Sequence, residues 1–292
     1  MKYKLTHLTK YTYQNPVNTY HSMVRLQPLT FVGQVCHQFA LRITPTPDEL
    51  VTRTDFFGNI QHFFSIDVSH LELKVIAESI VEVLPKIAID TASSMTCQEA
   101  QFYLRNTRNA KIELLQYLLS SPFIQWDEDI KNFAEDCFIK TLPLYDCVRN
   151  LCHKIFSQFD FDSNFTTINT PLKTVLKERK GVCQDFSHLS IACLRSMGFP
   201  ARYVSGYLET LPPPGKKKLQ GSDASHAWIS VYIPNMGWCE FDPTNDMIPQ
   251  ERHIVTAYGR DYSDVAPLKG IIFSSGRHTL SVEVDVIPQL EK

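Results

Sequence analysis

The sequence predicts an α+β protein in which an N-terminal β-sandwich precedes a domain built from helices and an antiparallel sheet. Three observations predict this fold class. Apolar and polar residues alternate up to about Leu84, the periodicity is then helical up to about Lys180, and the chain returns to strands after the helix that follows Cys183. We therefore expect an N-terminal domain over residues 1–84 and a second domain over residues 85–292 that includes C-terminal strands.

The N-terminal domain is expected from segments such as "YKLTHLTKYTYQ", "CHQFALRITP" and "LELKVIAESIVEVLP". Each has the period-two pattern of a half-buried strand, and several short strands of this kind are typical of a sandwich of two sheets. No catalytic grouping stands out in residues 1–84, so we interpret this domain as non-catalytic. The C-terminal segment "HTLSVEVDVIPQ" has the same period, and we expect it to pair in a sheet with Leu280, Val282, Val284 and Val286 facing one core.

The composition is that of an ordinary globular protein, with 292 residues, of which 43% are hydrophobic and 21% charged, and a formal net charge of −2. This charge gives no reason to expect a nucleic acid or a membrane surface as a partner. No stretch reaches the roughly 18 apolar residues of a membrane span, and the N-terminal residues lack the apolar region of a signal peptide. We expect a cytoplasmic protein.

The eight cysteines are scattered through the chain without the density or spacing of a disulfide scaffold, so we expect reduced thiols. The sequence has no C-x-x-C pair and no H-E-x-x-H motif. Cys152 and His153 are adjacent but lack companions at the spacing of metal ligands. We therefore expect no metal site.

The stretch "KGVCQDFSHLSIACLRSMGFP" predicts a helix that begins at or near Cys183. Its apolar residues recur at three- and four-residue intervals, and Gly198 with Pro200 supplies a stop. At a helix N-terminus the unpaired backbone N–H groups and the macrodipole favour a negative charge, so a thiol placed there is suited to act as a nucleophile. Cys193 lies in the apolar stripe of the same helix and is interpreted as a packing residue.

His226 and Asp242 are the candidate partners of this thiol. His226 lies at the start of the predicted strand "SHAWISVYIP", Asp242 lies at the end of the next strand, and the turn "PNMG" between them indicates a hairpin. Neighbouring antiparallel strands would bring both side chains to the same end of the sheet. A carboxylate beside an imidazole fixes its tautomer and supports its protonated form. The three residues, in this order, are what a Cys-His-Asp acyl-transfer site requires.

The segments "GVCQDFSHL" and "DASHAWISVYIPNMGWCEFDPTND" resemble the transglutaminase-like superfamily of cysteine acyltransferases and proteases. The segments "YTYQNPVNTYHSMVRLQP" and "DFFGNIQHFFSI" resemble the β-rich N-terminal domain of bacterial members, and "GRDYSDVAPLKG" resembles their post-catalytic segment. The resemblance implies a papain-like core, with Cys183 as nucleophile, His226 as general base and acid, and Asp242 as the residue that orients the imidazole. It implies no organic cofactor, and no acidic loop of the kind that binds calcium in some animal members is apparent.

The implied reaction is attack on an amide bond through a thioester intermediate, with a peptide or protein as the substrate. We expect hydrolysis of peptide or isopeptide bonds, and a protein-glutamine transglutaminase with an amine acceptor is the alternative. Arylamine acetyltransferases also use Cys-His-Asp, but the chain has no glycine loop for the phosphates of coenzyme A. A non-catalytic binding scaffold is a further alternative, for which a lost triad member would be expected. The loop "ETLPPPGKKKLQGSD" before His226 is expected to rim the cleft.

Overall fold

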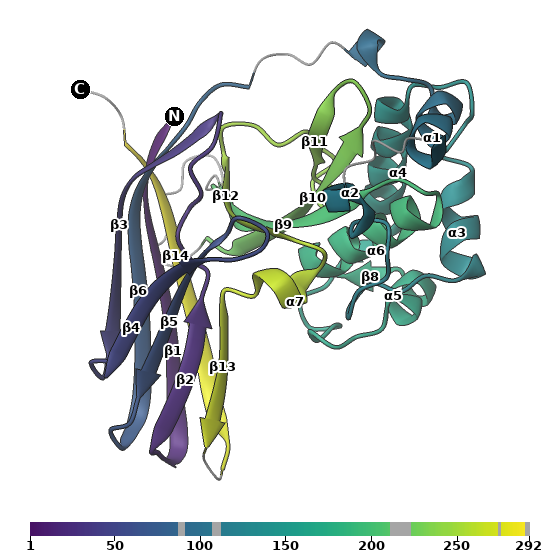
Figure 1. Cartoon of the computed structure of the whole chain (residues 1–292). Coiled ribbons are helices and arrows are strands. Elements are labelled where there is room, and N and C mark those ends of the chain that lie inside the picture. Colours follow the sequence, from purple (N-terminus) through teal and green to yellow (C-terminus); the bar gives the residue numbers. More distant parts are fainter. Residues whose placement is uncertain (87–90, 107–111, 211–222, 274–275, 290–292) are drawn as a thin grey trace, which may run out of the picture.

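The computed structural model describes residues 1–86, 91–106, 112–210, 223–273 and 276–289 (Figure 1). The described residues form three four-stranded sheets and one two-stranded sheet, together with helices that lie beside one of the larger sheets. Within the part of the chain that is described, no helix is both long and apolar enough to cross a membrane. The arrangement confirms the predicted α+β fold class, with the β-rich part at the N-terminus.

Two of the sheets form the sandwich, in the strand orders β14-β1-β6-β3 and β13-β2-β5-β4. Buried side chains such as Tyr13, Tyr20, Phe64 and Leu73 pack together in its core. The strands are β1 (Lys2–Val17), β2 (Thr19–Val24), β3 (Gln34–Thr44), β4 (Glu49–Thr54), β5 (Ile60–Ile66), β6 (His70–Val83), β13 (Leu268–Phe273) and β14 (His278–Gln289). The last two strands come from the C-terminal end of the chain, so each sheet of the sandwich is completed by a strand from the opposite end of the sequence (Figure 1).

The prediction that the C-terminal segment pairs in a sheet is confirmed, because β14 runs antiparallel to β1. Val284 and Val286 are buried, and they pack in a cluster that includes side chains of the neighbouring domain. Leu280 and Val282 are 53% and 47% exposed, so the expectation that all four side chains face one core is wrong for these two. The reason is that β14 is an edge strand, and only its C-terminal half reaches the neighbouring domain.

The second domain is built on the sheet β11-β10-β9-β12, in which β9 pairs with β10 and β12, and β10 pairs with β11, all antiparallel. Its strands are β9 (Ala201–Leu208), β10 (Ser225–Ile233), β11 (Gly237–Phe241) and β12 (His253–Gly259). The other elements are η1 (Thr91–Ser93), α1 (Cys97–Asn106), α2 (Ile112–Leu115), α3 (Glu128–Glu135), α4 (Leu144–Gln158), β7 (Asp160–Phe161), α5 (Leu172–Glu178), β8 (Lys180–Gly181), α6 (Cys183–Ser196) and α7 (Tyr262–Val265).

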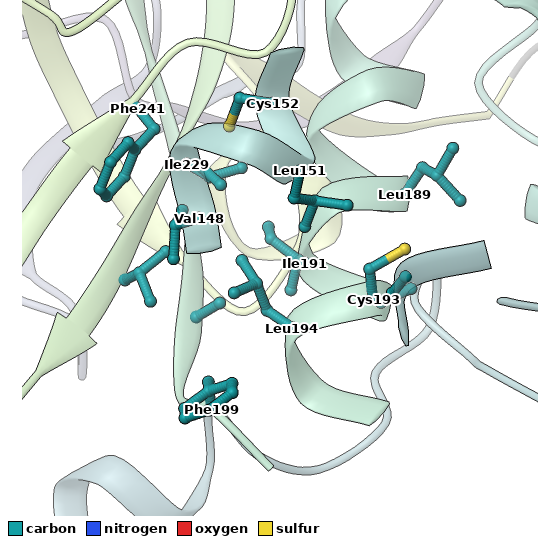
Figure 2. Close-up of a cluster of buried hydrophobic side chains, with 14 of the residues drawn as sticks. Val148, Leu151, Cys152, Leu189, Ile191, Cys193, Leu194, Phe199, Ile229 and Phe241 are labelled. Carbon is teal, nitrogen blue, oxygen red and sulfur yellow. The ribbon is translucent and has the colours of Figure 1, made fainter. Parts of the chain in front are cut away.

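Helix α6 is the central helix of this domain, and its apolar side chains are buried between the sheet and the other helices (Figure 2). Leu189, Ile191 and Leu194 of α6 share this core with Val148 of α4 and Ile229 of β10. Full burial of one such aliphatic side chain contributes about 1.5–3 kcal/mol. The packing therefore fixes α6, and with it the residue at its N-terminus, against the sheet.

The sandwich contacts the second domain through a separate cluster, in which Tyr3 and Leu5 of β1 pack with Tyr207 and Ile254. Buried hydrogen bonds accompany this contact. The Tyr207 hydroxyl lies 2.9 Å from His7 Nδ1, and the Tyr3 hydroxyl donates to Glu209 Oε2 over 3.1 Å. The N-terminal sheet thus supports β9, the strand that pairs with β10.

Candidate active site

Cys183 is the first residue of α6, as the sequence predicts. The preceding residue, Val182, has extended backbone angles, φ −119° and ψ 179°, and the helix ends at Ser196, before Gly198 at φ 85°. The first N–H groups of a helix have no acceptor within the helix, so the region around Cys183 presents free donors and the positive end of the helix dipole. Cys183 itself is half-buried.

The start of α6 is held by Asp185, a residue that the sequence analysis missed. Its Oδ2 atom accepts hydrogen bonds from the backbone N–H of Val182 over 2.8 Å and from the Thr166 hydroxyl over 2.7 Å. Burial raises the pKa of this carboxyl, while the two hydrogen bonds oppose the rise. A side chain on Gly181 would place a Cβ atom 2.9 Å from the Asp185 Cβ, so only glycine fits there. An acidic residue at the third helical position is a known helix-start signal and would have pointed to Asp185.

His226 and Asp242 meet at one end of the sheet. Strands β10 and β11 form the predicted hairpin, with Ile233 opposite Gly237 at the turn and Ile229 opposite Phe241 near the other end. His226 is the second residue of β10 and Asp242 directly follows β11. The His226 Nε2 atom lies 2.8 Å from Asp242 Oδ2, and the carboxylate is fully buried.

The structure also brings Cys183 close to this pair, since the Cys183 thiol is one of the neighbouring groups that raise the pKa of His226. Since Nε2 of His226 faces Asp242, the nitrogen left for the thiol is Nδ1. The three side chains that the sequence predicts as a site therefore form one connected chain of contacts, from a helix start through a strand start to the end of the next strand.

The electrostatics of the pair favour charge on both partners. Burial lowers the pKa of His226, but the hydrogen bonds to Asp242 and to Cys183 outweigh burial and raise the pKa to about 10. Burial raises the pKa of Asp242, but the hydrogen bonds from His226 and His253 outweigh it and hold the pKa well below its usual range. At neutral pH the site therefore contains an imidazolium beside a carboxylate.

Asp242 accepts more hydrogen bonds than the one from His226. Its Oδ1 atom accepts the backbone N–H groups of Thr244 over 2.9 Å and Asn245 over 3.2 Å, which closes the turn after β11. Its Oδ2 atom also accepts from Asn245 Nδ2 over 2.8 Å and from His253 Nε2 over 3.2 Å. The "DPTN" turn chemistry could have predicted the role of Asn245. His253 opens β12, which is separated from β10 by β9, so no local pattern predicts its position.

The same cluster is the place where an ion could be considered. The ligand atoms of His226, Asp242 and His253 lie within 4.8 Å of one another. The distances of 2.8 and 3.2 Å from the Asp242 oxygen are hydrogen-bond lengths, and we interpret the group as hydrogen-bonded. Cys152 and His153 are not brought together as a site, because the Cys152 side chain is buried and His153 Nδ1 lies 2.7 Å from Asp246 Oδ2.

Gly206 makes room for the aromatic support of His226. It lies opposite His226 in the pairing of β9 with β10. A Cβ atom on Gly206 would lie 2.0 Å from the carbonyl oxygen of Ile254 and 2.7 Å from the Trp228 ring. The buried Trp228 ring stacks against the His226 ring at a centroid distance of 5.9 Å. A larger residue at position 206 would displace the indole on which the imidazole rests.

An open hollow lies beside the start of α6, and a second hollow adjoins it. The nearer one, of about 540 Å³, is lined by Val182 and Gln184, which flank Cys183, and by polar residues of the segment 163–169. The second, of about 500 Å³, shares Asn169 with the first and includes the side chain of Trp126. Cys183 itself is not among the lining residues of either hollow. The loop over residues 209–223, which we expect to rim the cleft, lies mostly outside the described residues.

The other cysteines are placed differently from Cys183. Six are buried, as expected of packing residues, and Cys193 is fully enclosed in the core. Cys36 is the exception, because it is only half-buried. Cys36 lies at the irregularity in the pairing of β3 with β6.

We predict that iodoacetamide at pH 7 alkylates Cys183 on the order of ten times faster than Cys36. Burial raises the pKa of the Cys36 thiol, with partial opposition from a backbone hydrogen bond at Gln38, whereas Cys183 has an imidazolium beside it. Timed alkylation followed by peptide mass spectrometry measures both rates in one sample. Equal labelling of Cys36, or any rapid labelling of the buried Cys193, would contradict the prediction.

Two parts of this chain match known protein families. The family described as the transglutaminase-like superfamily matches residues 131–243, and the bacterial transglutaminase-like N-terminal region matches residues 3–82. An uncharacterised protein from Mycobacterium tuberculosis is 37% identical over 295 residues, which cover 98% of this chain and 93% of the relative. A protein-glutamine gamma-glutamyltransferase from Pseudomonas aeruginosa is 36% identical over 73 residues, which cover 25% of this chain and 11% of the relative.

Among solved structures, a candidate cysteine protease from Cytophaga hutchinsonii has a similar fold. Its crystal structure matches with a TM-score of 0.79 and a sequence identity of 22%, and the match covers 100% of this chain and 92% of that one. Both parts of the chain, the sandwich and the helical domain, thus recur together in another protein.

Proposed function

This chain belongs to the transglutaminase-like superfamily, and on that premise we propose that it is a cysteine-dependent enzyme that hydrolyses peptide or isopeptide bonds. The observation that carries the proposal is the continuous contact from Cys183 through His226 to the fully buried Asp242. A buried carboxylate that orients an imidazole, which in turn faces a thiol, is the arrangement that activates a cysteine for attack on a carbonyl.

In the first half of the reaction the Cys183 sulfur attacks the carbonyl carbon of the amide, and a carbon–sulfur bond forms. His226 gives its proton to the nitrogen of the leaving amine as the carbon–nitrogen bond breaks, which leaves a thioester and a neutral imidazole. The backbone N–H of Cys183, at the start of α6, is the proposed donor to the oxyanion. Removal of one such donor typically costs a factor of about 10² to 10³ in rate.

In the second half a water molecule attacks the thioester while His226 takes its proton. The carbon–sulfur bond breaks, the acid product leaves, and the imidazolium beside the thiolate is restored. Asp242 keeps its charge throughout and stabilises the imidazolium. We assign no cofactor, and the proposed substrate is a peptide or protein segment.

The second candidate is transamidation, in which an amine replaces water. The similarity of 73 residues to a protein-glutamine gamma-glutamyltransferase favours it. We place the chemistry in residues 85–292 and give the N-terminal domain a supporting role. The eight free cysteines support a reducing compartment such as the cytoplasm.

One experiment separates the two reactions. The full chain is incubated with a protein substrate such as casein, with and without a small primary amine, and the products are analysed by intact and peptide mass spectrometry. Hydrolysis adds the mass of water at each cut bond whether or not the amine is present. Amine incorporation at glutamine with no cleavage would replace hydrolysis by transamidation as the function.

A further inference from the structure

We propose that His253 is a positioning residue of this site, which donates an Nε2–H hydrogen bond to Asp242 and shares the negative charge of that carboxylate with His226. The inference rests on the proposed function and goes beyond it, because it adds a residue that touches neither thiol nor substrate. The distance from His253 Nε2 to Asp242 Oδ2 is 3.2 Å.

The hydrogen-bond partners of the His253 ring define its protonation. The backbone N–H of Gln250 points at Nδ1 over 3.4 Å, so Nδ1 accepts and the ring proton lies on Nε2. The titratable groups that face the ring are Asp242, His226 and Glu240. Burial lowers the pKa of His253 and outweighs the opposing contact with Asp242, so the ring is neutral at pH 7. A neutral donor fixes the carboxylate without competing with His226 for the positive charge.

The placement of His253 explains why a second contact is useful. The turn after β11 supplies the donors from Thr244 and Asn245, all of which come from residues just after the carboxylate. Like His226 of β10, His253 reaches Asp242 from another strand, and its strand, β12, lies on the far side of β9. The edge of the Trp228 ring packs against His253 at 5.2 Å, and the same ring stacks on His226. The two imidazoles are therefore held by one carboxylate and one indole.

Replacement of His253 by phenylalanine removes the donor and keeps an aromatic ring against Trp228. The Asp242 oxygen then has one donor fewer, so its negative charge acts more strongly on the remaining donors, including His226. We expect the His226 imidazolium to persist to higher pH by about half to one unit. His253→Gln retains an N–H donor, so the pH at which His226 loses its proton is expected to return towards that of the unchanged protein.

The experiment reads the charge of His226 through the thiol and needs no substrate. Alkylation rates of Cys183 are measured from pH 6 to 11 with iodoacetate and with iodoacetamide. The anionic reagent is attracted by the imidazolium and the neutral one is not, so the ratio of the two rates falls as His226 loses its proton. The midpoint is the pH at which half of this fall in the rate ratio has occurred. A matched control is His62→Phe, which removes another buried histidine, one that is hydrogen-bonded within the sandwich to Thr52 and Gln27. This control should leave the midpoint unchanged.

An upward shift of the midpoint in His253→Phe that is reversed in His253→Gln supports the positioning role. An unchanged or lowered midpoint in a folded His253→Phe protein overturns it, because a merely structural residue would not move the titration of His226. If His253→Phe does not fold, nitrogen NMR of the unchanged protein decides: a neutral His253 ring with its proton on Nε2 supports the role, and any other state overturns it. Slow, uniform alkylation of the unchanged protein would refute the proposed function, and the inference with it.

Discussion

Replacement of Cys183 by alanine is expected to abolish amide cleavage while leaving the fold intact. Alanine is a good helix former and keeps the first position of α6, whose geometry depends on Asp185 and not on the thiol. Without the sulfur no thioester forms, and the remaining residues only bind the substrate. In a serine protease the loss of the nucleophile costs about 10⁶ in turnover, and we expect a loss of similar size here.

The measurement is turnover on a cleaved protein substrate, with thermal melting on the same sample. Cys36→Ala is the matched control, because Cys36 is the other half-buried cysteine and lies in the sandwich, in β3. That variant should retain full turnover. A Cys183→Ala protein that melts normally and still cleaves the substrate would exclude Cys183 as the nucleophile and would leave the binding scaffold as the better description.

Asp242→Asn is expected to lower turnover by roughly 10 to 10³. The corresponding change in a serine triad costs about 10⁴, but a thiol ionises more readily than a hydroxyl and depends less on the base. The amide can still accept the Thr244 and Asn245 backbone N–H groups through its oxygen, which would preserve the turn. Its NH₂ group would then face His226 Nε2 and require the opposite tautomer of the ring. The pKa of His226 should fall from about 10, because the charged partner that raises it is gone.

This loss of charge gives the Asp242→Asn variant a distinct pH signature. A group whose folded pKa is raised is held in its charged form until the pH exceeds that pKa. In the unchanged protein, functions that need the imidazolium should therefore persist to about pH 10, and in Asp242→Asn they should end at lower pH. Turnover is compared with a melting curve at each pH. Unchanged turnover would remove Asp242 from the site, and a lost melting transition would mean that the carboxylate mainly holds the turn together.

The parts of the site that could be predicted from sequence have local signals. A helix start is visible in the stripe after Cys183, and a hairpin is visible in the two strands around "PNMG". The meeting of His226 with Asp242 follows from strand length and turn length alone. The β-sandwich could be predicted for the same reason, because the alternation of apolar and polar residues along a strand indicates which face of the sheet is buried.

The parts that could not be predicted depend on how the strands are arranged in the sheet and on which faces are covered. His253 follows Asp242 by only 11 residues, but it reaches the carboxylate from β12, which β10 and β9 separate from β11 in the sheet. Leu280 and Val282 have the same alternation as Val284 and Val286, yet only the latter pair meets another domain. Periodicity shows that a face is apolar, but it does not show how far along the strand the covering layer extends.

The pairing of β13 with β2 and of β14 with β1 has a consequence for how the chain is made. A ribosome delivers β1 and β2 first, and both must keep a bare edge until β13 and β14 have emerged. Bare edges are templates for pairing with other chains, and pairings between distant segments form slowly. The helical domain is synthesised entirely within this interval, so it can assemble while the sandwich is still open. Strands β1 and β2 would then stay without these partners until β13 and β14 pair with them and complete both sheets of the sandwich.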